Sequence, residues 1–128
     1  MKKRVTGIGG IFFTTKDPDK LKEWYGKHLG IPVDAYGWTF KWEEDHNGKG
    51  TTQWSLFKDD TAYFQPSEKQ FMINFRVENL HELLHVLKNE GVTIVGEAEE
   101  YDYGKFGWIL DPEGNKIELW EPVDSAFL

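Results

Sequence analysis

The chain has 128 residues, 39% of them hydrophobic and 16% aromatic, which is enough for one compact domain with a sizeable core. Its formal net charge of −7 and pI near 5.1 argue against nucleic acid or an anionic membrane as a partner. With no cysteine, the sequence excludes disulfides, thiolate metal sites and a cysteine nucleophile. The acidity would favour a cationic ligand, although many proteins are acidic simply because charge keeps them soluble.

The N-terminal residues begin like a signal peptide but do not continue as one. After the basic start at 1–4, the apolar run is short, is broken by threonine and glycine, and leads directly into a helix cap. No apolar segment approaches the roughly 20 residues that a membrane-spanning helix needs. We therefore expect a cytoplasmic protein with no membrane partner.

The first half of the chain predicts a strand followed by a capped helix. Residues 5–15 are rich in β-branched and aromatic side chains, which is typical of a strand. Asp17 is a good N-cap, and Pro18 follows at the first helical position, where its missing N–H costs nothing. The apolar residues of the helix fall on one stripe and are Leu21, Trp24, Tyr25, His28 and Leu29. Gly30 then ends the helix as a C-cap.

Strands are expected next at 33–42, as one or two strands, and at 51–57. The residues between them, 43–50, are polar, contain glycine and predict a hairpin loop. A second polar segment at 67–70 is the boundary between two halves. We place the modules of a single domain, residues 1–128, at about 5–66 and 70–122.

The second half repeats this order. Residues 72–77 alternate as a strand, Asn79 caps a helix near 80–90, and Gly91 ends it. The remaining strands are expected at 92–95, 106–110 and 116–120. A tight turn is expected at 111–115, where Gly114 and Asn115 can adopt positive φ, and an acidic mobile lip at 97–104.

Two such halves predict an α+β fold of two tandem βαβββ modules. The arrangement resembles the vicinal oxygen chelate superfamily, which includes glyoxalase I, bleomycin-resistance proteins, fosfomycin-resistance enzymes and extradiol dioxygenases. The resemblance covers about residues 5–122 and is most specific at 17–30 and at 111–119. It implies a curled mixed sheet, or half-barrel, that encloses a ligand cleft, and it implies a homodimer.

The resemblance also implies positions for metal ligands, on the first and last strands of each module. The two first-strand positions fall on Gly10 and Met72, each seven residues before a helix cap. Glycine has no side chain, and a thioether is too soft for Zn²⁺, Mn²⁺ or Ni²⁺. Glu118 matches the last-strand position, and Gln53 is its nearest counterpart in the first half. We therefore predict no metal site and no cofactor, with a divalent metal at Glu118 as the alternative.

The remaining candidate residues are expected to line the cleft. Strand alternation turns Ile117 and Leu119 toward the helix side, which leaves Glu118 and Trp120 on the face that points into the curl. The same alternation points Met72, Asn74 and Arg76 into the curl. Arg76 could pair with Glu118 or receive a ligand carboxylate or phosphate. The full set of expected ligand-binding residues is Phe12, Trp42, Gln53, Met72, Asn74, Arg76, Trp108, Glu118 and Trp120.

These residues support two functions of different class. The first is a metal-independent protein that binds a small molecule, as bleomycin-resistance proteins do. The second is a metal-dependent, glyoxalase-like lyase or isomerase in which Glu118 is a catalytic residue, as metal ligand or general base. Dioxygenase activity is disfavoured because non-haem iron needs two histidines beside a carboxylate, and the strand positions supply none.

Overall fold

The computed structural model describes residues 4–44 and 49–128. It contains two α-helices, eight strands and two short 3₁₀ helices in the described residues. In chain order they are β1 (Val5–Thr15), α1 (Pro18–Leu29), β2 (Trp38–Lys41), η1 (Trp42–Glu44), β3 (Thr51–Lys58), β4 (Phe71–Val77), α2 (Leu80–Asn89), β5 (Thr93–Ile94), β6 (Glu99–Tyr101), β7 (Gly104–Leu110), β8 (Lys116–Pro122) and η2 (Asp124–Ala126).

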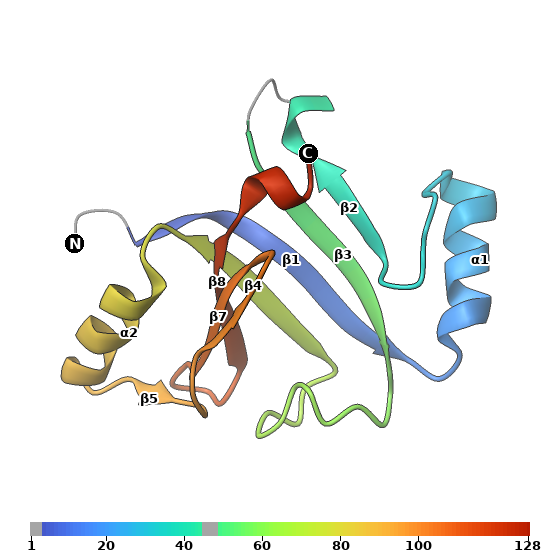
Figure 1. The fold of residues 1–128 in the computed structure, drawn as a ribbon. Helices are drawn as coiled ribbons and strands as arrows, with labels where there is room; N and C mark the ends of the chain where they lie inside the picture. Colours follow the sequence, from blue (N-terminus) through green and yellow to red (C-terminus); the bar gives the residue numbers. More distant parts are fainter. Residues whose placement is uncertain (1–3, 45–48) are drawn as a thin grey trace.

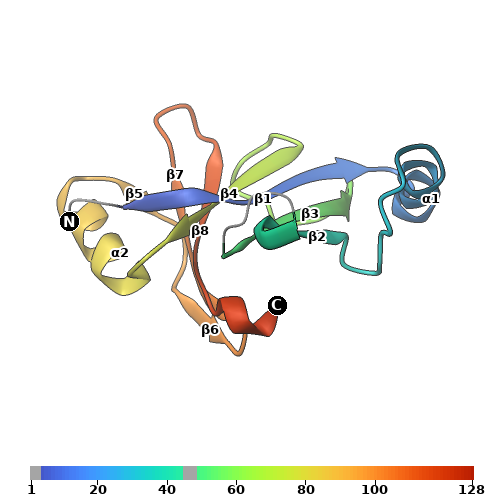
Figure 2. The ribbon, with the colours of Figure 1, turned by 90° about the horizontal axis from the view of Figure 1, so that it is seen from above.

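The strands form one mixed sheet. Its order is β2-β3-β1-β4-β8-β7-β5, and β6 pairs with β7 outside this path. The central pair, β1 and β4, is antiparallel and joins the two halves of the chain, while β1–β3 and β4–β8 are parallel. The sheet is open and curled, as the sequence predicts. Figures 1 and 2 both show α1 and α2 at opposite ends of it.

Both helices begin as predicted. The Asp17 side chain accepts a hydrogen bond from the Lys20 N–H at 3.1 Å, and the Asn79 side chain accepts from the Glu82 N–H at 3.2 Å. Each cap satisfies one backbone donor that the first helical turn would otherwise leave unpaired. Gly30 ends α1 with φ of 70°.

The second half is better packed than the first. Leu80 and Leu83 of α2 are almost fully buried against Val77 and Leu119, and Ile117 packs around them. This confirms that the odd-numbered residues of β8 face the helix. At α1, the apolar stripe is only partly covered, since Trp24 remains half exposed while Tyr25 packs on Trp54 with ring centroids 4.7 Å apart.

Several local expectations need correction. The first half contains the order βαββ in its described residues, because 33–37 holds only an isolated bridge between Asp34 and Gly37. Trp42 lies in η1 and not on a strand. Glu99–Tyr101 of the expected lip forms a strand. The expected loop at 43–50 falls partly outside the described residues, and His46 with it.

The turn at 111–115 forms as expected. Asp111 Oδ1 accepts hydrogen bonds from the backbone N–H groups of Glu113 and Asn115, both at 2.9 Å, and Gly114 has φ of 81°. In the parts of the chain that the structure describes, neither helix has the length and apolar character needed to cross a membrane.

Candidate functional site

A cleft of about 670 Å³ lies in the curl of the sheet. Residues from both halves line it, together with the C-terminal segment. They are Gly9, Phe12, Asp34, Tyr36, Thr39, Gln53, Ser55, Phe57, Tyr63, Asn74, Glu99, Tyr101, Tyr103, Phe106, Trp108, Glu118, Trp120 and Phe127. Ten of these eighteen side chains are aromatic, so the cleft suits a ligand with a large apolar surface.

Glu118 lies at the floor of the cleft and is 2% exposed. Its Oε2 atom accepts hydrogen bonds from the Tyr63 hydroxyl at 2.5 Å and from the Trp108 indole N–H at 2.9 Å. Its Oε1 atom accepts from the Asn74 side-chain amide at 2.6 Å. Three donors from three segments therefore fix the orientation of one buried carboxylate.

Burial dominates the electrostatics of this group. It raises the pKa of Glu118, because desolvation penalises the charged form, while the donors Tyr63, Asn74 and Trp108 and the charge of Lys116 act in the opposite direction. Burial also raises the pKa of Tyr63, and the Glu118 charge adds to that increase. The Tyr63 hydroxyl therefore stays protonated and remains a donor at neutral pH.

The corresponding polar group of the first half is neutral. Gln53 pairs with Gly10 of β1 as Glu118 pairs with Asn74 of β4. The Gln53 carbonyl accepts a hydrogen bond from the Thr39 hydroxyl, and its amide donates to Ser55 Oγ at 3.2 Å. The first half of the chain thus contributes a neutral, hydrogen-bonded amide to the cleft through Gln53, and the second half contributes a carboxylate through Glu118.

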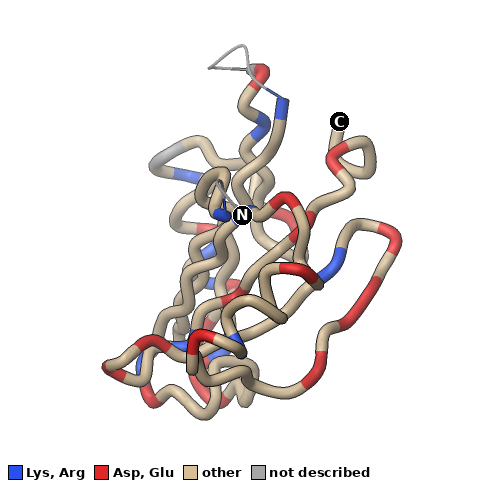
Figure 3. The backbone as a smooth tube through the Cα atoms, turned by 90° about the vertical axis from the view of Figure 1, so that its left-hand side faces the viewer, with Lys and Arg blue, Asp and Glu red and all other residues tan. Residues whose placement is uncertain are grey.

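The β6–β7 hairpin forms one wall of the cleft. Its Tyr101 and Tyr103 rings are stacked with centroids 5.2 Å apart, and both make edge contacts with Phe106. Phe106 is in turn stacked with Trp120. Acidic residues follow each other along this hairpin (Figure 3). The segment expected to be a lip therefore carries a row of aromatic rings toward the cleft.

The structure brings six of the nine expected ligand-binding residues into the cleft lining. These are Phe12, Gln53, Asn74, Trp108, Glu118 and Trp120. Met72 instead fills the core beneath the floor, where it is fully buried with Phe12, Phe64 and Trp108. Trp42 and Arg76 also lie outside the lining.

Arg76 has a different partner from those the sequence suggests. Its guanidinium donates to both carboxylate oxygens of Asp124, at 2.7 and 2.8 Å, and to the Thr51 carbonyl at 3.2 Å. It lies between the rings of Trp42 and Trp120, with its Cζ 4.8 and 5.4 Å from their centroids. The register explains this, because Arg76 of β4 stands beside Trp120 of β8 and not beside Glu118. Arg76 therefore anchors the C-terminal turn.

Gly10 and Met72 lie close together but do not face each other across the cleft. On the neighbouring strands β1 and β4, Gly10 pairs with Asn74 and Met72 pairs with Phe12. Neither residue lines the cleft. The glycine that matters for the site is Gly9, where the register of β1 shifts: a Cβ there would lie 1.9 Å from Asn74 Oδ1.

We expect Gly9→Ala to destabilise the protein by about 1–3 kcal/mol, because the added methyl group must push Asn74 away from Glu118. Urea unfolding measures this change. Gly26→Ala in α1 is the matched control, since alanine is the better helix former while its Cβ would lie 3.3 Å from the Ile31 carbonyl oxygen; these effects oppose each other, and the expected change is smaller than about 1 kcal/mol. An equal loss in both variants would contradict the role of Gly9.

The residues at the expected metal-ligand positions do not fit a metal ion. Gly10 offers no donor atom, and the Met72 sulfur is buried in the core. Both oxygens of Glu118 already face N–H or O–H donors, and an indole N–H cannot be a ligand. Among the described residues, no three His, Asp or Glu side chains converge.

Sequence reasoning missed Tyr63 and the hairpin tyrosines. Tyr63 lies in the connection between β3 and β4, and its contact with Glu118 spans 55 residues. Two adjacent aromatic residues, Tyr63 and Phe64, in an otherwise polar connection are the one signal that could have indicated it. Tyr101 and Tyr103 show period-two alternation, which predicts two rings on one face of a strand.

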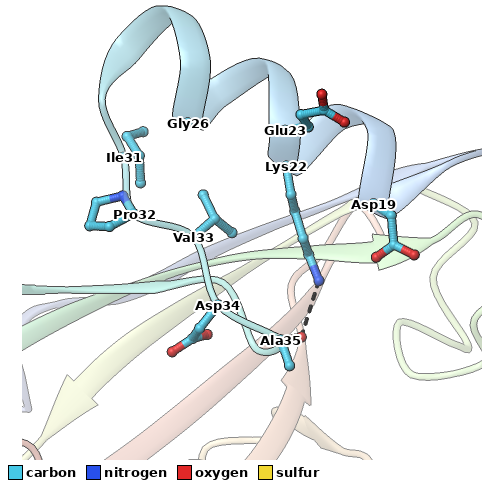
Figure 4. Close-up of a pocket in the computed structure, with 9 residues that line it drawn as sticks. All are labelled: Asp19, Lys22, Glu23, Gly26, Ile31, Pro32, Val33, Asp34 and Ala35. Atoms are coloured by element: carbon cyan, nitrogen blue, oxygen red, sulfur yellow. Dashed lines mark hydrogen bonds between the residues drawn. The ribbon is translucent and has the colours of Figure 1, made fainter.

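A second hollow of about 660 Å³ lies between α1 and the segment 31–35 (Figure 4). The Lys22 ammonium donates to the Ala35 carbonyl at 3.1 Å across it. Apolar side chains from Ile31 to Val33 occupy one side, and charged residues of α1 occupy the other. This hollow is a wide surface groove that adjoins the cleft only through Asp34, which lines both.

Comparison with known proteins gives a family and a set of structural neighbours. The model of the glyoxalase-like domain matches residues 10–120. A search of curated proteins gives no match. The methylmalonyl-CoA epimerase of Mycobacterium tuberculosis is 20% identical, with a TM-score of 0.65 over 98% of this chain and 94% of that one.

Two other solved structures extend the comparison. A variant of the Streptomyces coelicolor methylmalonyl-CoA epimerase, in complex with 2-nitronate-propionyl-CoA, is 16% identical, with a TM-score of 0.70 over 93% of this chain and 96% of that one. The Mn(II)-bound glyoxalase of Novosphingobium aromaticivorans is 19% identical, with a TM-score of 0.65 over 93% of this chain and 40% of that one. At these identities the likeness shows the fold alone.

Proposed function

The chain belongs to the glyoxalase-like domain family of the vicinal oxygen chelate superfamily, and we propose that it is a metal-independent protein that binds a small organic molecule in its aromatic cleft. One observation carries this proposal: the only matching metal-ligand position that holds a carboxylate, Glu118, has both oxygens engaged by Tyr63, Asn74 and Trp108. A carboxylate held in this way is a fixed acceptor in a binding site.

The structural neighbours do not identify the ligand of this protein. Two of these structures are methylmalonyl-CoA epimerases, and methylmalonyl-CoA carries a carboxylate and phosphates. Of the described residues that line the cleft here, none is Lys, Arg or His. An anionic group would find no countercharge in the lining and would lie beside Glu118. We therefore do not extend that substrate to this protein.

The experiment that tests the proposal measures metal and ligand binding together. Purified protein is incubated with Zn²⁺, Ni²⁺, Mn²⁺ and Fe²⁺, dialysed, and assayed for bound metal, and the same preparations are screened by thermal shift against a metabolite and antibiotic library. We expect less than one tenth of an equivalent of metal and at least one ligand that raises Tm. We expect Glu118→Gln to weaken that ligand at least tenfold, because a neutral amide replaces the charged acceptor.

The control for this experiment is Glu113→Gln, which removes the same charge from the exposed turn at 111–115. It should bind every ligand as the parent does. One equivalent of metal per chain, lost in Glu118→Gln and kept in Glu113→Gln, would overturn the proposal.

That outcome would support a second function, a glyoxalase-like lyase or isomerase. The observation in its favour is that burial raises the pKa of Glu118, and a raised pKa suits a general base that removes a proton beside a carbonyl. In this case Glu118→Gln would abolish turnover of a 2-oxoaldehyde–thiol adduct or acyl thioester. Ligand binding without turnover separates the two functions.

We also propose a cytoplasmic homodimer. Four apolar residues of β1 and β4, Ile11, Phe13, Phe71 and Ile73, pair on the face of the sheet opposite to Phe12 and Asn74. Ile11 and Phe71 are 44% and 43% exposed in the single chain. A contiguous apolar strip of this kind favours contact with a second copy of the chain. Sedimentation velocity measures the oligomeric state directly.

A further inference from the structure

The charged residues that line the cleft, among those the structure describes, are all acidic. Of the described residues that line it, Asp34, Glu99 and Glu118 are acidic, and none is basic. Glu118 is at the floor, Glu99 is on the β6–β7 hairpin, and Asp34 is at the far end beside Tyr36. The described lining therefore carries three carboxylates and no basic side chain.

Among the residues that the structure describes, Glu118 has no charged hydrogen-bonding partner. Its three hydrogen-bond donors are a phenol, an indole and an amide, all neutral at pH 7. Among the ion pairs of the described residues, none includes Glu118. The charge of Lys116 acts on Glu118, but its ammonium donates to the Tyr63 carbonyl at 2.6 Å and forms no ion pair with the carboxylate. A buried carboxylate without a direct ion pair is costly, and a cationic ligand that contacts it would reduce that cost.

The Glu118 carboxylate can accept one more hydrogen bond than the protein supplies among the described residues. Oε2 accepts two hydrogen bonds and Oε1 accepts one, so Oε1 retains an acceptor position. An N–H group of a ligand could occupy it, since Glu118 belongs to the cleft lining. A hydroxyl could do so as well, but only a positively charged donor would also neutralise the carboxylate.

The aromatic walls favour the same charge. The faces of stacked rings carry negative electrostatic potential, which attracts cations within about 6 Å. The walls contain three stacked pairs: Phe57 with Tyr63, Tyr101 with Tyr103, and Phe106 with Trp120. Ring faces near the cleft already hold cations of the protein itself, since Lys116 Nζ lies 5.2 Å from the Tyr63 ring and Arg76 Cζ lies 5.4 Å from the Trp120 ring.

From these contacts we infer that the cleft selects a flat organic cation that carries N–H donors, such as an amino-substituted heteroaromatic or an aryl amidinium. The charged nitrogen binds at Glu118, and the ring body lies between the aromatic walls. This inference rests on the proposed binding function and adds the chemical class of the ligand to it. It predicts discrimination by charge among molecules of one shape.

Three acridines test the inference, because they share a ring system and differ in charge. At pH 7.5, 9-aminoacridine is a cation with N–H donors, acridine is neutral, and acridine-9-carboxylate is an anion. Their dissociation constants are measured by fluorescence titration with the parent, Glu118→Gln, Glu99→Gln and the control Glu113→Gln. Circular dichroism spectra and Tm values of each variant establish that it is folded.

We expect the cation to bind at least tenfold more tightly than neutral acridine, and the anion to bind more weakly still. In Glu118→Gln the preference for the cation should fall to threefold or less, while the affinity for neutral acridine stays within twofold. Glu99→Gln should reduce the preference by a smaller factor, because that carboxylate is exposed on the hairpin. Glu113→Gln should not change it.

Other outcomes would overturn the inference in distinguishable ways. Equal binding of all three acridines, or tighter binding of the anion, would leave the binding function standing and remove its charge selectivity. Failure of all three, while the library screen finds ligands of another class, would do the same. If no molecule in either experiment binds in the cleft, the proposed function itself fails.

Discussion

Replacing Arg76 with alanine is expected to lower the free energy of unfolding by about 4 kcal/mol. Arg76 is 4% exposed, and its guanidinium donates to both carboxylate oxygens of Asp124 and lies between two tryptophan rings. Its removal leaves the Thr51 carbonyl without this donor and leaves an empty space between Trp42 and Trp120. Because Asp124 begins η2, the loss should also free the C-terminal segment from the cleft.

Urea unfolding at pH 7 measures the effect, and Arg4→Ala is the control. Arg4 forms an ion pair of similar geometry with Glu90, but both side chains are more than a third exposed, so little change is expected there. The loss of stability in Asp124→Asn should lie between those of Arg76→Ala and Arg4→Ala. The Asp124 side chain is 32% exposed, but the Arg76 charge would remain buried without its partner. A loss in Arg76→Ala no larger than that in Arg4→Ala would show that the buried pair contributes little.

Glu118→Ala is expected to destabilise the protein by about 3 kcal/mol near pH 5, because three buried donors lose their acceptor at about 1 kcal/mol or more each. A position in the cleft would by itself suggest that the fold tolerates this change. Glu118 does line the cleft, but its carboxylate also accepts the hydrogen bonds that hold Tyr63, Asn74 and Trp108 in place.

The difference between parent and Glu118→Ala should shrink as pH rises. The pKa of Glu118 is raised above 4.5 in the folded chain, mainly by burial, so the folded chain holds this proton more tightly than the unfolded chain. The resulting stability is fully present below pH 4.5 and is lost as pH rises through the folded pKa. The unfolding free energies of both proteins at pH 5, 6, 7 and 8 give the difference directly.

Other titrating groups cancel in that difference, except those that contact Glu118. Tyr63 keeps its proton throughout this range, because its pKa is raised. Burial lowers the pKa of Lys116, and its charge favours the ionised carboxylate, so Lys116→Met should steepen the dependence on pH. A difference that stays constant, or that grows with pH, would show that burial does not control this carboxylate.

The fold could be predicted because its signals are local. Asp17 and Asn79 each precede an apolar helical stripe, and both helices begin where these caps place them. Period-two alternation in β4 and β8 assigned Asn74 and Glu118 to the cleft and Leu119 to the helix side. Each of these inferences depends on residues a few positions apart.

The contacts of the site could not be predicted, because they depend on register between distant segments. Arg76 is two positions beyond Asn74, so it stands beside Trp120 and meets Asp124, which the C-terminal turn brings within reach. Tyr63 comes from a connection that has no regular structure and therefore no periodic pattern. A register shift in β1 brings Gly9 against the Asn74 side chain, although Gly10 is the residue that pairs with Asn74 in the sheet.

The pairing of Gln53 with Gly10 and of Glu118 with Asn74 has a consequence for how the protein can change in evolution. Gln53 and Glu118 occupy comparable positions in the two halves of the sheet. The Gln53 amide accepts a hydrogen bond from Thr39, whereas the Glu118 carboxylate accepts one from Tyr63. Each polar cluster is built almost entirely from its own side of the cleft. Substitutions around Gln53 could therefore reshape one end of the cleft while Glu118 keeps its three donors, so the proposed ligand specificity could change without loss of the buried acceptor.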